Sequence, residues 1–131
     1  MGIRAELPGD ASASGLARTL VRQAITDEGM RQDALIVVSE LVANAFRHGE
    51  PPLRLDLLDE QDGQPPGTLK IQVSNQQRTG STEVPTLTTG GRADGLGGRG
   101  MDLVDRLAAD WGWELQDRRM TVWARLDPGS R

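Results

Sequence analysis

The chain has 131 residues, a formal net charge of −4 and no cysteine. This length suits one hydrophobic core, so residues 1–131 are expected to form a single domain. Without cysteine the chain has no disulfides or thiolate metal sites, and a single histidine excludes multi-histidine sites, so a bound metal would need hard oxygen ligands.

Charge and hydropathy also limit the partners. A net negative charge disfavours nucleic acid as a direct partner, because the favourable release of counterions requires a basic surface. The sequence start lacks an apolar signal core, and the longest apolar run, at 34–38, is too short to cross a bilayer. We therefore expect a cytoplasmic protein without a membrane partner. An anionic small ligand stays open, because helix N-termini bind phosphate at short range.

Two helices are predicted in the first half of the chain. Residues 13–25 repeat apolar side chains at helical spacing, with Ser12 or Ser14 as a suitable N-cap. A longer helix is predicted from an Asp33 cap to about Arg47, since a glycine and two prolines follow closely and end it.

The second half is predicted to contain strands, a loop and a short helix. Alternating apolar residues and intervening turn residues indicate two hairpins, and a glycine-rich loop precedes a third helical repeat. The predicted strands cover 53–59, 68–75, 111–116 and 120–126, the loop covers 76–94, and the helix starts at Met101. This order indicates an α+β two-layer sandwich, a mixed or antiparallel sheet covered on one face by about three helices.

The segment SELVANAFRHGE places Glu40, Asn44 and His48 in one column of the second helix. At 100° per residue the column lies opposite Val38 and Val42, where a solvated surface is the ordinary expectation. Apolar residues border it on both sides, however, which is typical of a pocket wall. There a carboxylate can act as a base and an amide oxygen can hold a hard cation. For His48 alone, a structural role near the helix C-terminus is preferred.

Six of the eleven residues at 90–100 are glycine. Their backbone N–H groups can converge on an anion, and the helix that follows adds its positive end. Gly95, Gly97 and Gly100 fit the dinucleotide pattern G-x-G-x-x-G, but no buried strand precedes them, and no P-loop is present. A lid over phosphates explains the run better than a plain linker, because the run leads directly into a helix.

SELVANAFRHG, followed by GLGGRGMDLVDRLAADWGW and then MTVWARL, resembles the GHKL ATPase superfamily, whose fold is also called the Bergerat or histidine-kinase-ATPase-like fold. Within it, the chain is similar to small stand-alone ATP-binding proteins of the anti-sigma-factor serine/threonine kinase type. The resemblance extends from the first helix to the last strand. It implies a nucleotide held between the helices and a lid.

The resemblance also implies roles for individual residues. Glu40 would be the general base, and Asn44 would be the side-chain ligand of the Mg²⁺ that bridges the ATP phosphates. Thr121 would line the adenine end. The lid glycines would contact the phosphates through their backbone amides, and Arg99 would be a charge partner of the phosphates. These glycines are Gly95, Gly97, Gly98 and Gly100.

One position departs from the family pattern. Relatives follow the corresponding strand with D-x-G-x-G, whose aspartate accepts a hydrogen bond from the adenine amino group, whereas this chain has Asn75 in VSNQQRTG. An asparagine carbonyl can accept the same bond without charge assistance, at a cost of about 1–3 kcal/mol in binding free energy.

Two functions follow from these residues. The resemblance implies an ATP-binding regulatory protein, a serine/threonine kinase that phosphorylates an antagonist protein and controls a sigma factor by partner switching; it also allows a homodimer. Asn75 and the missing glycines favour the alternative, a non-catalytic protein-interaction module with weakened or lost nucleotide binding. A sensor histidine kinase domain is disfavoured, because the only histidine lies inside the nucleotide motif.

Overall fold

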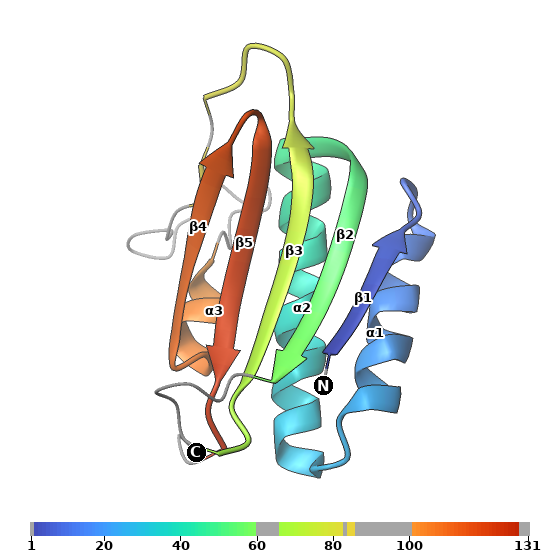
Figure 1. Cartoon of the computed structure of the whole chain (residues 1–131), viewed down its shortest axis with the longest axis vertical. Helices are drawn as coiled ribbons and strands as arrows, with labels where there is room; N and C mark the ends of the chain where they lie inside the picture. The colour runs from blue at the N-terminus through green and yellow to red at the C-terminus, as the bar shows by residue number, and fades with distance from the viewer. Residues whose placement is uncertain (1, 60–65, 83, 86–100, 129–131) are drawn as a thin grey trace.

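The computed structural model describes residues 2–59, 66–82, 84–85 and 101–128. Within these residues the chain forms a single five-stranded antiparallel sheet of order β1-β2-β3-β5-β4. All helices lie on one face of the sheet (Figure 1), which confirms the predicted α+β two-layer fold. The elements are β1 Gly2–Leu7, α1 Ser12–Ala24, α2 Glu28–His48, β2 Gly49–Asp59, β3 Leu69–Gln77, α3 Asp102–Leu107, β4 Asp110–Gln116 and β5 Arg119–Leu126.

The core lies between the sheet and α2. Side chains alternate along each strand, so every second residue of β3 and β5 points at the helices and is buried. On β3 these residues are apolar from Leu69 to Val73 and then become polar at Asn75 and Gln77. The inward face therefore changes from hydrophobic core to polar surface at the C-terminal end of β3.

The second helix begins earlier than predicted. Asp27, and not Asp33, is its N-cap, and the Asp27 side chain accepts a hydrogen bond from the Met30 backbone N–H at 2.8 Å. Met30 and Ala34 are buried, so the apolar face continues for a further turn toward the N-terminus. No helix of the described residues is long and apolar enough to span a membrane.

The side chain of Asp10, which precedes the predicted start of the first helix, binds the first residue of α1. Asp10 Oδ1 accepts hydrogen bonds from the Ser12 hydroxyl at 2.5 Å and from the Ser12 backbone N–H at 2.9 Å. These two bonds, the hydroxyl bond first, lower the pKa of the Asp10 carboxyl below its usual value. Ser12 therefore acts as a donor to Asp10, and the helix has no side-chain cap at its own N-cap position, Ala11.

The strand β1 is absent from the sequence prediction, and β2 is longer than predicted. β1 pairs along its full length with the end of β2, from Gly2 opposite Leu58 to Leu7 opposite Leu53. β2 starts at Gly49, and its pairing with β3 shifts register between Glu50 and Arg54, where two prolines interrupt the ladder.

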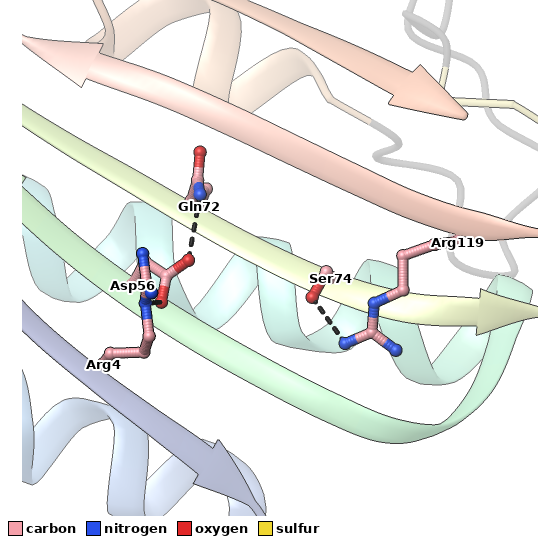
Figure 2. A network of polar contacts seen from close by, with 5 residues as sticks. All are labelled: Arg4, Asp56, Gln72, Ser74 and Arg119. Carbon is pink, nitrogen blue, oxygen red and sulfur yellow. Dashed lines mark hydrogen bonds and ion pairs between the residues drawn. The ribbon is translucent and has the colours of Figure 1, made fainter. Parts of the chain in front are cut away.

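The face away from the helices is tied together by polar side chains (Figure 2). Asp56 on β2 accepts hydrogen bonds from Arg4 Nε at 3.0 Å and from Gln72 Nε2 at 2.9 Å, which connects β1, β2 and β3. Arg119 on β5 donates to Ser74 Oγ on β3 at 2.8 Å. Four strands are thus connected across this face by side chains as well as by the backbone.

Candidate functional site

A small cavity lies where the C-terminal end of α2 meets β3 and β5. Its volume is about 10 Å³, which is room for about one water molecule. Its described lining residues come from the second helix, the third and fifth strands and the segment after β3: Asn44, His48, Asn75, Gln77, Val84, Pro85 and Met120. This cavity brings together two asparagines that the sequence analysis singled out from segments far apart in the chain.

Hydrogen bonds from arginine side chains position the elements around the cavity. Arg78, directly after β3, donates to the carbonyl oxygens of Phe46 at 3.1 Å and Arg47 at 3.0 Å. These are last-turn carbonyls of α2, which lack partners within the helix. Arg118, in the turn before β5, donates to the Gln77 carbonyl oxygen at 2.7 Å. The end of β3 is thereby tied both to α2 and to the β4–β5 turn.

Asn44 lies at the edge of the buried face of α2 and is 5% exposed. At 100° per residue the buried residues span a sector about 160° wide, from Asn44 through Val37 and Leu41 to Val42. The prediction that Asn44 faces away from the core is therefore wrong, because Val37 and Leu41 belong to the core. The prediction of a pocket wall is confirmed for Asn44 and for His48.

Asn75 points inward from β3 and is 3% exposed. Its Nδ2 donates a hydrogen bond to the backbone carbonyl oxygen of Gln76 at 2.8 Å, which fixes the orientation of the amide. The side chain lies against Gly49, where an added Cβ would overlap the Asn75 amide. Gly49 thus provides the space that allows Asn75 to turn toward the cavity.

Glu40 lies one helical turn before Asn44 and is partly buried. Four residues separate them, so their backbones are about 6 Å apart along the helix axis. Glu40 is not among the described residues that line the cavity. The structure therefore places Glu40 on the same helix as Asn44, one turn before it, and outside the described wall of the cavity.

Thr121 lies on the other face of the sheet. It is paired with Ser74 on β3 and Glu114 on β4, and its neighbour Met120 is the β5 residue that points inward and lines the cavity. The fold does not bring Thr121 together with Asn44 and Asn75. The predicted lid residues Gly95, Gly97, Gly98, Arg99 and Gly100 lie outside the described residues.

Comparison with known proteins places this fold in a family. The model of the histidine kinase-like ATPase domain matches residues 9–126, which is most of the chain. The chain belongs to the histidine kinase-like ATPase family. This description implies nucleotide binding, and the matched range contains all the described lining residues of the cavity.

The fold also resembles a solved structure. The crystal structure of the RsbU and RsbW domains of Rv1364c from Mycobacterium tuberculosis matches with a TM-score of 0.67 and 14% identity. The match covers 97% of this chain and 32% of that one, so the present chain spans about a third of the length of the chain in that structure. At this identity the likeness concerns the fold alone. No curated protein matches the chain.

Several lining residues of this histidine kinase-like ATPase domain were missed by the sequence analysis. Met120 was predicted as an ordinary strand residue, and Gln77 was placed in the predicted 76–94 loop, whereas β3 continues to Gln77. Only the register between β3 and β5, with Asn75 opposite Met120, reveals that these residues share a cavity. Gly49 was interpreted only as a helix stop. The described wall has three buried amides and a histidine beside apolar side chains, and these polar groups can form hydrogen bonds with a ligand.

Proposed function

We propose that this chain binds ATP with Mg²⁺ at the Asn44–Asn75 cavity and acts as an anti-sigma-factor-type serine/threonine kinase. Its partners would be an antagonist protein, which it phosphorylates, and a sigma factor, which it controls by partner switching. The observation that carries the proposal is the meeting of two buried asparagine side chains in one cavity of a histidine kinase-like ATPase domain. Buried amides are costly without partners, so polar groups brought together at a cavity indicate a ligand.

Asn75 is proposed to recognise the adenine edge. Because its Nδ2 donates to the Gln76 carbonyl oxygen, the atom that would meet a ligand is Oδ1, an acceptor. An adenine amino group is a donor and would complement it. Met120 and Pro85 would contact the flat faces of the base.

Asn44 is proposed to hold Mg²⁺ through its amide oxygen. The described residues contain no group of three histidine or acidic side chains that could hold a metal by themselves. This donor set fits Mg²⁺ bound together with a nucleotide, because Mg²⁺ commonly takes one or two protein ligands and completes its shell with phosphate oxygens and water. The metal would neutralise phosphate charge.

Glu40 is proposed as the base for phosphoryl transfer. It would accept the proton of the attacking serine or threonine hydroxyl, while the amides of 95–100 and Arg99 would bind the phosphates. Phosphoryl transfer depends mainly on positioning and charge stabilisation, so few groups are needed.

Calorimetric titration with ATP and Mg²⁺ tests the binding site. We expect Asn44→Ala to weaken binding by at least about tenfold. Asn75→Asp should strengthen binding by less than about tenfold, because the ionised acceptor makes the stronger hydrogen bond with adenine but the variant loses the Nδ2 bond to the Gln76 carbonyl oxygen. Gln32→Ala is the matched control, since Gln32 is exposed on the same helix and is not among the described lining residues of this cavity. Equal binding by the natural protein and folded Asn44→Ala would contradict the site.

A phosphotransfer assay tests the kinase. A protein captured from the native cell with a tagged copy of the chain would be incubated with radiolabelled ATP and the natural protein or Glu40→Gln. We expect label on a serine or threonine of the partner with the natural protein and at least a hundredfold less with Glu40→Gln. Unchanged transfer by Glu40→Gln would remove Glu40 from the mechanism.

A non-catalytic interaction module is the second candidate function. The narrowness of the cavity, about 10 Å³ with Val84 and Pro85 in its wall, favours it, because an adenine ring needs much more room. Absence of ATP binding by the natural protein, together with binding by Asn75→Asp, would support this alternative.

A further inference from the structure

The C-terminal end of α2 continues directly into β2. His48 is the last residue of the helix and Gly49 is the first residue of the strand. The backbone of Gly49 is extended, with φ −146° and ψ −167°, so the chain does not fold back over the helix end as it does at a glycine cap of positive φ. The carbonyl groups of the last helical turn therefore need hydrogen-bond donors from elsewhere in the molecule.

Arg78 supplies two of these donors. It follows β3 directly, and its Nη1 donates to the Arg47 carbonyl oxygen at 3.0 Å while its Nη2 donates to the Phe46 carbonyl oxygen at 3.1 Å. The planar guanidinium thus binds two successive carbonyls at once, and its positive charge is favoured at the negative end of a helix. In Figure 1 the ends of α2 and β3 lie together at the top of the view.

The backbone on both sides of Arg78 is itself held by one residue. The Gln77 N–H donates to the Arg118 carbonyl oxygen at 2.7 Å, and Arg118 Nη2 donates to the Gln77 carbonyl oxygen at 2.7 Å. Arg118 Nη2 also donates to Thr79 Oγ1 at 3.3 Å. Because its neighbours in the chain are fixed to the β4–β5 turn, Arg78 joins the end of β3 to the end of α2 at a defined spacing.

We propose that Arg78 is a positioning residue that sets the spacing between Asn44 and Asn75 and thereby the affinity of the cavity for nucleotide. Phe46 and Arg47 follow Asn44 by two and three residues, and Arg78 follows Asn75 by three, so its hydrogen bonds join the two chain segments close to both amides. Groups that bind one ligand together must be held to within about 0.5 Å. Arg78 is not among the described lining residues of the cavity, so it acts through the asparagines. This role rests on the ATP site proposed above.

Nuclear magnetic resonance of the ¹⁵N-labelled full chain without nucleotide tests the spacing. The side-chain amide signals of Asn44 and Asn75 are assigned from the variants that lack them, and we expect Arg78→Ala to shift both. Arg119→Ala is the matched control, because Arg119 donates to the Pro52 carbonyl oxygen and to Ser74 Oγ on the face away from the helices. It should leave both signals in place. Unchanged signals in folded Arg78→Ala would overturn the proposal.

Calorimetric titration with ATP and Mg²⁺ tests the consequence for binding. Arg78→Ala should weaken binding by about fivefold, as for the loss of about one hydrogen bond, whereas Arg119→Ala should not. In the Asn44→Ala background, Arg78→Ala should weaken binding by less than about twofold, because the spacing no longer matters once one amide is absent. Equal weakening in both backgrounds would indicate a general structural defect and would overturn the positioning role.

Arg78→Lys separates geometry from charge. Lysine keeps the positive charge at the end of α2 but presents a single ammonium group in place of the guanidinium fork. We therefore expect Arg78→Lys to shift the amide signals and to weaken ATP binding as well. Full retention of both properties would overturn a role in spacing. Absence of ATP binding by the natural protein would overturn the proposed function, and the amide signals alone would then confirm or overturn the spacing role of Arg78.

Discussion

Gly49 shows how the absence of one side chain shapes the candidate nucleotide site. Asn75 is on β3 and Gly49 begins β2, and the Asn75 amide lies in the space that a Cβ at position 49 would take. The backbone of Gly49 is extended, so the requirement for glycine here is one of space and not of backbone angle. Any side chain at this position must displace the residue proposed to recognise adenine.

Replacing Gly49 therefore tests the packing of the site. We expect Gly49→Ala to lower the free energy of unfolding by about 1–3 kcal/mol, as is typical of overpacking, and to weaken ATP binding. Gly15→Ala is the matched control: Gly15 lies in helix α1 with nothing within 4 Å of an added Cβ, so it should raise stability by about 0.5–1 kcal/mol. Urea denaturation measures both, and an equal gain in the two variants would contradict the overlap.

At the scale of elements, the polar face of the sheet contributes to strand pairing. Asp56 is 6% exposed and receives hydrogen bonds from Arg4 and Gln72, so it connects the edge strand β1 to β3 through β2. Arg4 has a side chain that is 65% exposed, so solvent weakens its ion pair with Asp56. Asp56 is therefore expected to contribute more to the free energy of unfolding than Arg4 does.

This inequality can be measured by mutation. We expect Asp56→Ala to lower the free energy of unfolding by about 1–3 kcal/mol, because it leaves two donors without their acceptor. Arg4→Ala should cost less than about 1 kcal/mol, because the carboxylate keeps its bond from Gln72 and Arg4 is largely solvated. Thermal unfolding of both variants provides the comparison; a larger loss in Arg4→Ala would show that the ion pair dominates.

The start of α1 has a pH dependence of known sign. The Ser12 hydroxyl and then the Ser12 N–H bind the ionised form of Asp10 and lower its pKa in the folded state below the usual value of 3.8. A group of this kind stabilises the fold above its unfolded pKa and loses that contribution as the pH falls through the folded pKa. The melting temperature of Asp10→Ala should therefore be slightly below that of the natural protein at pH 7, and the difference should shrink below about pH 3.8. A constant difference across this range would exclude Asp10 ionisation as its cause.

At the scale of the whole molecule, sequence patterns predicted the helices and hairpins whose formation depends on neighbouring residues in the chain. The hairpins followed from alternation and the second helix from its apolar repeat, whereas β1 is a short edge strand whose alternation of Ile3, Ala5 and Leu7 is too brief to stand out. The face of α2 was misjudged because α2 packs against α1 and α3 as well as against the sheet, so its buried sector is wider than the helix period alone indicates. The placing of Thr121 depends on which face of β5 is inward, which only pairing with β3 determines.

The same core connects every element of the fold, and this has a measurable consequence. Buried residues of β1, both long helices, α3 and the central strands belong to one hydrophobic cluster, from Leu7 to Leu126. A single core of this kind favours cooperative two-state unfolding. Circular dichroism, which follows the helices, and tryptophan fluorescence, which follows β4 and β5, should give the same urea midpoint.

Val21→Ala on α1, far in sequence from every tryptophan, should shift both midpoints equally and lower the free energy of unfolding by about 1–2 kcal/mol, because it removes packed methyl groups from a fully buried site. Separate midpoints would mean that α1 and β1 unfold apart from the nucleotide half, and then residues 1–131 would not be one cooperative domain.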